Sequence, residues 1–152
     1  MDLNAAVKLV LHPWHRLTRG LTLGTRTVVL NGEGEVLLVR HGYAAGWHLP
    51  GGGVERGETI FESARRELVE EAGIVIEEEL KLHGLFLNDA NFKGDHVAVL
   101  VVRKFQQKPF KPNLEIAEAR FFAVEALPEG TTGGTRRRIG EVVRGHHPSG
   151  HW

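Results

Sequence analysis

The chain has 152 residues, of which 41% are hydrophobic and 25% charged, a composition typical of one globular domain with a sizeable core. Its 19 basic and 19 acidic side chains leave no formal net charge, so no overall field would attract nucleic acid or a membrane surface. The absence of cysteine excludes disulfides and thiolate metal sites and fits the reducing cytoplasm, and no apolar run approaches the roughly 20 residues of a membrane span.

The first 20 residues are predicted to hold a short amphipathic helix and a connector. Apolar side chains recur at helical spacing between residues 3 and 12, and Pro13 ends the pattern. No small-residue cleavage site of a signal peptide follows it. Such a helix packs on its own domain or on a second subunit, so it offers a surface for a homodimer.

The next segment is predicted to form two strands and a glycine-rich loop. Residues 21–30 are rich in Thr, Val and Leu and indicate a strand. Asn31–Gly34 has strong turn composition, so residues 35–40 are expected to return as the second strand of a hairpin. A loop of small residues over 41–46 then leads to Gly51–Gly53, where the backbone can approach a ligand closely.

A helix is predicted after this loop, over residues 60–72. Thr59 is a good N-cap residue, Glu62 completes a capping box, and Gly73 follows the last turn as a natural end. At 100° per residue, one side of this helix is apolar and should face the core. The residues on that apolar side are Ile60, Phe61, Ala64, Leu68 and Ala72.

Three carboxylates lie beside the apolar side, at Glu67, Glu70 and Glu71. Their i, i+3, i+4 spacing directs them to one patch, and Glu71 should sit at the edge of the core. Like charges at this spacing cost roughly 0.2–0.5 kcal/mol per pair on an exposed helix. A hard divalent cation such as Mg²⁺ takes oxygen ligands and would remove that repulsion. The spacing therefore indicates a metal site, the alternative being a solvated acidic face.

Strands and turns continue to a second helix. Residues 74–87 indicate a strand with charged interruptions, 95–105 a buried strand and 114–124 another strand. Residues 131–143 indicate a helix, and 146–152 a short, mobile tail. One central and one late helix among strands favour an α+β, or mixed α/β/α, layered fold.

The stretch Gly52–Ile74 fits Gly-x5-Glu-x7-Arg-Glu-aliphatic-x-Glu-Glu-x-Gly-aliphatic without departure. It resembles the signature motif of the Nudix hydrolases, and nine fixed positions make it far more specific than a lone glycine motif. The resemblance implies an α/β/α sandwich with a mixed β-sheet between helices, over a domain of about residues 21–145. The fixed positions are Gly52, Glu58, Arg66, Glu67, Leu68, Glu70, Glu71, Gly73 and Ile74.

The resemblance also implies the chemistry. Nudix hydrolases cleave a nucleoside diphosphate linked to another moiety, by attack of water on phosphorus. A magnesium ion, for which Mn²⁺ can substitute, would be held by the three helix carboxylates and by the carbonyl of Gly52. Arg66 would orient a carboxylate through a bidentate pair, with Glu58 in a supporting part. The general base differs within the family, and the candidates here are Glu67 and Glu115, the latter also as an additional metal ligand.

Substrate identity is less well marked. Tyr43, Trp47 and Phe92 could stack on a base or cap the pocket, and packing is the alternative for each. The marks that the family shows for ADP-ribose, dinucleoside polyphosphates and the nicotinamide dinucleotide are absent. We therefore expect a small-molecule nucleoside diphosphate derivative as the partner. A non-catalytic nucleotide-binding module and an RNA 5′-end pyrophosphohydrolase are the alternatives, and the neutral charge speaks against RNA.

Several other polar groups are predicted to have no catalytic part. His96 should be structural, and the histidines of the tail match no metal-site spacing. Arg136–Arg138 are expected to lie on a solvated face of the last helix, with an RNA phosphate contact as the sharper alternative.

Overall fold

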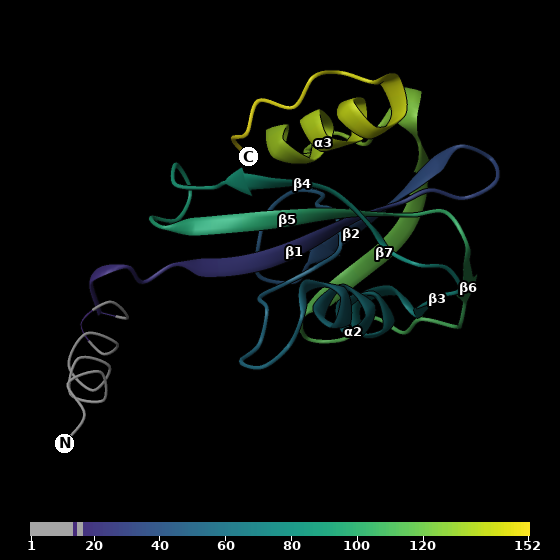
Figure 1. Cartoon of the computed structure of the whole chain (residues 1–152). Helices are drawn as coiled ribbons and strands as arrows, with labels where there is room; N and C mark the ends of the chain where they lie inside the picture. The colour runs from purple at the N-terminus through teal and green to yellow at the C-terminus, as the bar shows by residue number, and fades with distance from the viewer. Residues whose placement is uncertain (1–13, 15–16) are drawn as a thin grey trace.

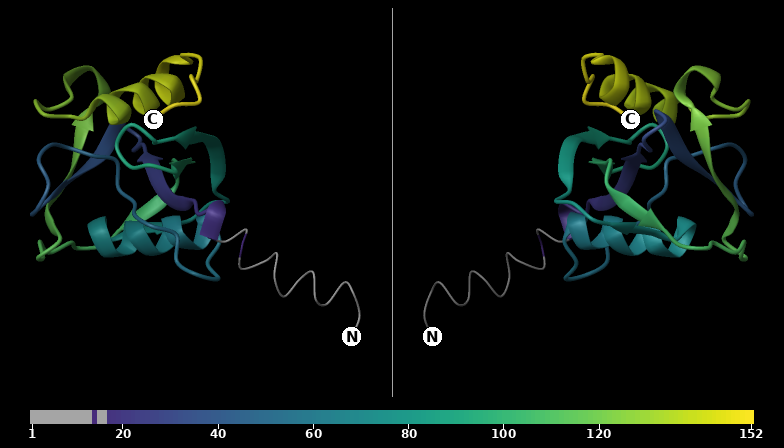
Figure 2. Two further views of the ribbon diagram at one scale, coloured as in Figure 1. Left: turned by 90° about the vertical axis from the view of Figure 1, so that its left-hand side faces the viewer. Right: turned by 90° about the vertical axis from the view of Figure 1, so that its right-hand side faces the viewer.

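The computed structural model describes residue 14 and residues 17–152 (Figure 1). The amphipathic helix predicted over residues 3–12 lies outside the described residues. Two main helices lie on opposite sides of the strands, so the expected α/β/α sandwich is confirmed (Figures 1 and 2). The elements in order are β1 Thr22–Val29, β2 Glu35–His41, α2 Ile60–Ala72, β3 Ile74–Ile76, β4 Lys81–Leu87, β5 Asp95–Val102, β6 Phe105–Gln107, β7 Ile116–Ala123, the 3₁₀ helix η1 Val124–Ala126 and α3 Gly133–Arg144.

The strands form a mixed arrangement in which β1 is central to the site. β1 pairs in parallel with β5, from Thr22 opposite Asp95 to Val29 opposite Val102, and β4 runs antiparallel on the other side of β5. β2 pairs antiparallel with β7, and β3 with β6. β5 is buried along most of its length, as its valine-rich sequence requires, whereas β1 is buried mainly over its second half.

The predicted hairpin between β1 and β2 is wrong. The turn forms, and the side chain of Asn31 accepts from the amides of Glu33 and Glu35. In the described chain, however, a single bridge between Leu30 and Val36 joins the two strands. Each strand finds a longer partner far along the sequence, β5 for β1 and β7 for β2, and local turn composition cannot reveal that choice.

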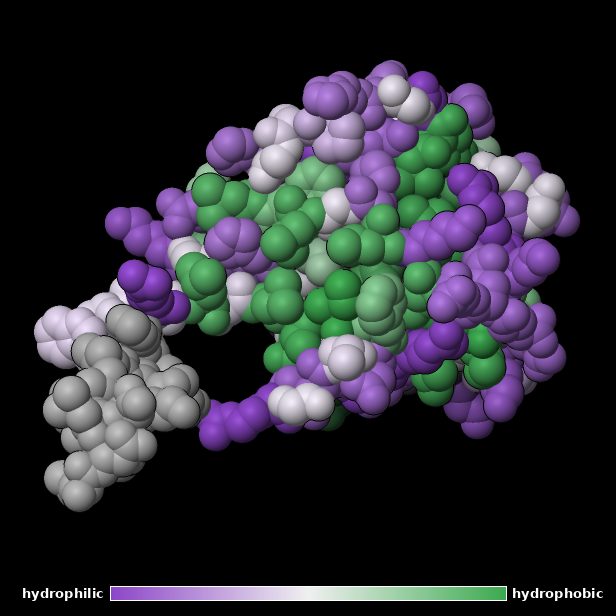
Figure 3. All heavy atoms as spheres, in the orientation of Figure 1, coloured by the Kyte–Doolittle hydropathy of each residue, from purple (hydrophilic) through white to green (hydrophobic). Residues whose placement is uncertain are grey.

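Two apolar clusters fill the two sides of the strands. Val28 and Leu38 belong to the cluster that contains Ile139 of α3, whereas Val29 and Leu37 belong to the cluster that contains Leu68 of α2. The side-chain alternation of a strand explains this division, because neighbouring residues point to opposite faces. Figure 3 shows further apolar side chains gathered at the surface of the strands, between the two helices.

α2 begins and ends as the sequence predicts. The Thr59 hydroxyl accepts from the Glu62 amide, and the Glu62 carboxylate accepts from the Thr59 amide, which completes the capping box. Gly73 ends the helix in the left-handed conformation, with φ of 67°. One predicted core residue is wrong: Phe61 is 41% exposed and lies outside the cluster that contains Ala64 and Leu68.

We expect Leu68→Ala to lower the free energy of unfolding by about 2–5 kcal/mol, because it leaves a cavity in the α2 cluster. Val69→Ala is the matched control, since Val69 is the next residue and 50% exposed, and its effect should stay within about 0.5 kcal/mol. Urea unfolding of both variants measures the difference, and equal losses would contradict the assigned core.

Arg136–Arg138 are not one solvated face. Arg136 and Arg137 are exposed, but the side chain of Arg138 is fully buried, with its guanidinium 3.8 Å from the centroid of the Phe86 ring.

Residues 146–152 also differ from the mobile tail expected, because they turn back and pair with β4. Among the described residues, no helix is long and apolar enough to cross a membrane.

Candidate active site

α2 brings its carboxylates to the strands at three different depths. Glu71 is 3% exposed and Glu67 is 9% exposed, one turn apart on the face that meets β1 and β7. The Glu70 side chain is more than half exposed and lies at the rim. The helical spacing predicts Glu71 at the edge of the core, but the structure buries it more deeply. An ionised carboxylate at this position would lose most of its hydrating water.

The glycine loop lies directly against these two carboxylates. The Gly51 amide donates to Oε2 of Glu71 at 2.7 Å. A Cβ at Gly51 would stand 2.8 Å from the carbonyl carbon of Thr25, and φ of 141° disfavours any side chain there. A Cβ at Gly52 would stand 2.8 Å from Cδ of Glu67. Both glycines are therefore needed for the loop to pack between β1 and α2.

The carbonyl of Gly52 has one of its two acceptor positions engaged, so the second stays available to the ion that the resemblance implies. It accepts from the amide of Thr25 at 2.8 Å, so the structure engages it with β1. The Gly51 carbonyl is likewise engaged, by the guanidinium of Arg26 at 2.7 Å. Gly52 also has a steric part, since its missing side chain makes room for the Glu67 carboxylate, and its part as a metal ligand stays a prediction.

Burial changes the ionisation of the two inner carboxylates. Desolvation raises the pKa of Glu71 to about 8, against a smaller lowering by the Gly51 amide. Desolvation also raises the pKa of Glu67, although hydrogen bonding to Arg66 pulls it down. The site therefore holds two desolvated carboxylates whose ionised forms are costly in the protein alone, and a bound cation would stabilise those ionised forms.

Arg66 ties the loop to the helix. Its guanidinium donates to both oxygens of Glu58, at 2.9 and 3.1 Å, and to Oε1 of Glu67 at 2.8 Å. A further bond reaches the carbonyl of Gly53 at 3.1 Å. The bond to Arg66 is the main cause that lowers the pKa of Glu58. Arg66 thus orients Glu67 and holds the loop, through a bidentate pair with Glu58.

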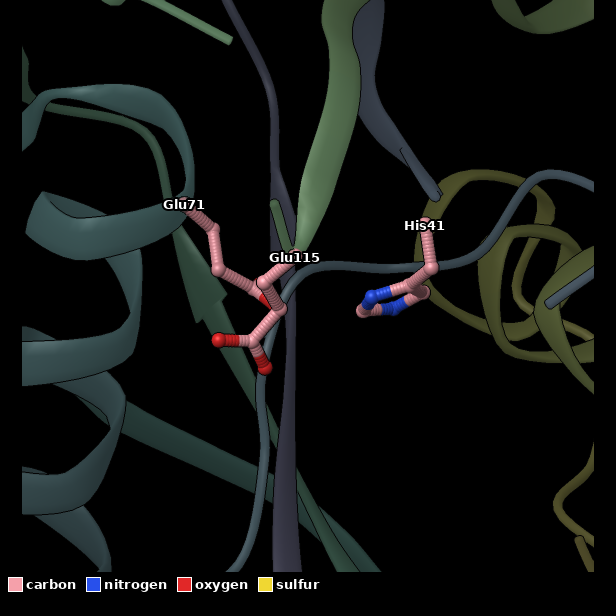
Figure 4. Close-up of side chains that lie close together, drawn as sticks. All are labelled: His41, Glu71 and Glu115. Carbon is pink, nitrogen blue, oxygen red and sulfur yellow. The ribbon is translucent and has the colours of Figure 1, made fainter. Parts of the chain in front are cut away.

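A second group of ligand atoms comes from outside the motif. Oxygen or nitrogen atoms of His41, Glu71 and Glu115 lie within 4.8 Å of one another. Figure 4 shows Glu71 reaching across from α2 to Glu115, which precedes β7, with the ring of His41 at the end of β2 turned toward them. The Gly42 amide donates to the carbonyl of Glu115 at 2.9 Å and holds the two chain segments together.

Sequence reasoning missed His41. Leu37, Val39 and His41 share one face of β2, and Leu37 packs in the cluster of α2, so a polar residue continuing that face was an available signal. Burial, followed by the nearby Arg26 and His48, lowers the pKa of His41. Its Nδ1 is buried and has no hydrogen-bond partner among the described residues. Two carboxylates and a neutral imidazole are a donor set that fits a divalent cation.

A cavity of about 250 Å³ opens on the other side of the glycine loop. Gly52, Gly53 and Arg26 form its inner end, and the segment after α3 contributes its outer wall. One guanidinium nitrogen of Arg26 donates to the carbonyls of Leu49 and Gly51, at 3.0 and 2.7 Å. The other two nitrogens of Arg26 have no partner within the part of the chain that the structure describes. Arg26 was also missed, because a lone arginine on a strand carries no signal by itself.

The three residues predicted to bind substrate have different surroundings. Tyr43 is exposed, and its ring centroid lies 5.2 Å from that of His41, beside the carboxylates. Trp47 packs edge-on against Phe122 at 4.8 Å, in the core cluster of α3. Phe92 is exposed in the loop between β4 and β5 and does not line the cavity. The structure brings Tyr43 to the acidic cluster, but not Trp47 or Phe92.

Comparison with known proteins accounts for this arrangement. Residues 20–141 match the NUDIX domain. The chain belongs to the Nudix family. A MutT Nudix hydrolase from Burkholderia pseudomallei superimposes with a TM-score of 0.69 at 26% identity, covering 80% of this chain and 98% of that structure. A UDP-X diphosphatase shares the fold, with a TM-score of 0.61 at 24% identity, over 97% of this chain and 73% of that structure.

Curated relatives of this Nudix chain match over shorter stretches. A putative 8-oxo-dGTP diphosphatase of Bacillus subtilis is 44% identical over 52 residues, 34% of this chain and 35% of that protein. The 8-oxo-dGDP phosphatase of Mus musculus is 38% identical over 65 residues, 41% of this chain and 20% of that protein. An RNA pyrophosphohydrolase of Coxiella burnetii is 42% identical over 57 residues, 37% and 25% of the two chains. The chain thus spans about a third or less of the length of these relatives.

Proposed function

We propose that the protein is a magnesium-dependent hydrolase that cleaves the diphosphate bond of a nucleoside diphosphate linked to another moiety. One observation carries this proposal: Glu71, a buried carboxylate of α2, lies with Glu115 and His41 within 4.8 Å beside a glycine loop, an arrangement that a bound cation would stabilise. An ion-binding structural site would need no open cavity next to it, and here a cavity adjoins the same loop.

Glu71, Glu67 and Glu115 would hold the ion. Glu70 would lie at the solvent-exposed edge of the ion site, and the ring of His41 would face the carboxylates of Glu71 and Glu115. When bound, magnesium supplies neutralisation of phosphate charge and a more acidic water. Arg66 keeps Glu67 oriented through its 2.8 Å bond, and the Gly51 amide does the same for Glu71. The partner-free nitrogens of Arg26 support a contact with a phosphate oxygen between the cavity and the carboxylates.

Glu115 is the better supported candidate for the general base. In the described structure its carboxylate accepts no hydrogen bond, whereas oxygens of Glu67 and Glu71 are held by Arg66 and by Gly51. If one oxygen of Glu115 binds the ion, its second oxygen stays unengaged and can take the proton of the attacking water. Its backbone is fixed by the Asn113 side chain, which accepts from its amide at 2.9 Å.

The substrate class is a small nucleotide derivative. Relatives are named for 8-oxo-dGTP, 8-oxo-dGDP and RNA, and a zero net charge favours the small molecules over RNA. Such substrates fit the cytoplasmic location that the composition favours. If the protein hydrolysed 5′-triphosphorylated RNA in preference to free nucleotides, its substrate would be the 5′ end of RNA and not a small nucleotide derivative.

A substrate panel with product identification tests the proposal. Purified protein is incubated with nucleoside triphosphates, oxidised purine nucleotides, nucleotide sugars and ADP-ribose, with Mg²⁺ or Mn²⁺, and the products are separated by chromatography. We expect release of a nucleoside monophosphate from at least one member. Binding of nucleotides without turnover across the panel would instead establish a non-catalytic module.

We expect Glu115→Gln to lower kcat by about 10²–10⁴-fold, because the amide cannot accept the proton of water. Glu118→Gln is the matched control, since Glu118 pairs with Arg40 and Arg120 on the exposed side of β7. An equal effect of the two substitutions on kcat would exclude Glu115 as the base.

A further inference from the structure

The segment after α3 returns to the sheet and reaches the cavity. The amide of Leu87 donates to the carbonyl of Gly150, and the amide of Trp152 donates to the carbonyl of Leu87, both at 2.9 Å. These bonds add a short parallel bridge at the end of β4 (Figure 1). Trp152 thereby lies over the cavity that borders the glycine loop.

Arg138 fixes this segment from beneath. One of its terminal nitrogens donates to the carbonyl of His151 at 2.9 Å, and the other to Oε1 of Glu141 at 2.6 Å. The second oxygen of Glu141 pairs with His83 at 2.9 Å. Arg137 donates to the carbonyl of Trp152. A fully buried arginine is costly unless it is paired, so its partners here indicate that the position of the segment is built into the fold.

The indole of Trp152 forms a wall between two cavities. It lines the cavity of about 250 Å³ beside the glycine loop, and also a second one of about 360 Å³ that is bordered by Gly133 and Arg137. Gly134 allows this position, because a Cβ there would stand 2.6 Å from Cε2 of the indole. Removing the indole would join the two cavities.

The first cavity has the size and the lining for one flat group. It is smaller than the roughly 300–1,000 Å³ of pockets that take a whole drug-sized ligand. Leu49, Val97 and Trp152 give it apolar walls, and Asn88 and Asp95 give it a polar end. Each oxygen of Asp95 accepts one hydrogen bond, from the Thr22 hydroxyl at 2.6 Å and the Asn88 amide at 2.7 Å. A carboxylate has about four acceptor sites, so capacity remains for donors of a ligand.

We propose that Trp152, positioned by Arg138, is the specificity-determining wall of a subsite for a purine base that presents N–H donors, as guanine does. The inference rests on the proposed function, and it assigns the base end of the substrate. Arg26 and Gly52 line the same cavity and adjoin the carboxylates, so a base held against Trp152 would direct its phosphates toward the ion-binding group. Guanine offers the two oxygens of Asp95 two adjacent donors, N1–H and the exocyclic amino group, whereas cytosine offers only its exocyclic amino group, next to the acceptor N3.

Calorimetric binding of GMP and CMP, with Mg²⁺ present, tests this subsite apart from turnover. We expect the wild type to bind GMP at least 10-fold more tightly than CMP. Trp152→Ala should weaken GMP binding at least 10-fold and bring the ratio below 3, whereas Trp152→Phe should keep most of the preference. Trp14→Ala is the matched control, because Trp14 is exposed and lines neither cavity.

Two further variants separate recognition from general loss of structure. Asp95→Asn should remove the preference for GMP while thermal unfolding stays near that of the wild type. Gly134→Ala should act like Trp152→Ala, because the added methyl displaces the indole without removing it. On the best substrate of the panel, Trp152→Ala should raise KM and change kcat by less than 3-fold, as expected for a binding wall.

The outcomes distinguish the two proposals. If the wild type hydrolyses nucleotides but GMP and CMP bind equally, or Trp152→Ala leaves their ratio unchanged, the subsite is refuted and the hydrolase stands. If the GMP preference is present and lost in Trp152→Ala, but no member of the panel is cleaved, the subsite stands and the hydrolase is refuted.

Discussion

Replacing Glu71 with Gln is expected to lower kcat by about 1,000-fold or more and, at neutral pH, to stabilise the protein when no metal is bound. The loss follows because the most buried ligand of the proposed ion can no longer carry charge, and several kcal/mol of transition-state stabilisation disappear. The amide oxygen of Gln can still accept from Gly51, so the loop should keep its position.

The gain in stability of Glu71→Gln without metal comes from removing a buried ionisable group. Burial raises the pKa of Glu71 from 4.5 to about 8, so ionising it in the folded protein costs about 3–5 kcal/mol above that pH. A neutral Gln escapes this cost. Thermal unfolding in EDTA and steady-state kinetics in Mg²⁺ measure the two effects. Glu79→Gln, on an exposed residue, is the control for both. Near wild-type turnover in Glu71→Gln would remove this carboxylate from the mechanism.

Magnesium is expected to stabilise the protein more at pH 8 than at pH 5.5. The folded pKa of Glu71 is raised, so the metal-free folded state binds a proton that the unfolded state has lost, throughout the window between about 4.5 and about 8. Its stability therefore falls as pH rises through this window and becomes constant above it. Ion binding needs the Glu71 carboxylate deprotonated. Magnesium therefore offsets the loss of stability most at high pH, where that loss is greatest.

A Tm series with and without excess Mg²⁺ checks this pH dependence. At 100 times the dissociation constant the ion should add about 2.7 kcal/mol, a shift of several degrees, while EDTA should abolish turnover. In Glu71→Gln the pH dependence of the metal-free protein should flatten. A magnesium shift of Tm that is the same at both pH values would contradict the assignment of the ion to this carboxylate.

The parts of the site that lie on one helix were predictable, since spacing along a helix fixes direction. The acidic positions of α2 and its caps follow from local sequence, whereas Glu71, predicted at the edge of the core, is buried more deeply than its spacing indicates. His41 and Arg26 were not predictable in the same way, because their places depend on which strands pair. β2 pairs with β7 and so brings His41 to Glu115, and β1 pairs with β5 instead of β2.

Arg138 and Trp152 show a different limit. Three consecutive arginines on a helix indicate a solvated face, and a stretch with two glycines and a proline after a helix indicates a mobile tail. Neither pattern reveals that Phe86 offers a ring for the guanidinium, or that the end of β4 has free backbone groups for Gly150 and Trp152. Such pairings are set by tertiary structure, across more than 50 residues of sequence, as from Phe86 to Arg138.

The alternation along β1 has a consequence for insertions and deletions. The Thr25 hydroxyl lies 3.2 Å from that of Ser63 on α2, while the next residue, Arg26, faces the other side of the strand, where its guanidinium donates to the carbonyls of Leu49 and Gly51. If one residue were lost after Arg26 in this strand, every residue before the gap would change faces, which would set the guanidinium of Arg26 against α2 and leave the carbonyls of Leu49 and Gly51 without their donor. The Asn31–Gly34 turn does not have two faces to keep in register. Insertions and deletions in natural homologues should therefore occur in this turn and not within β1.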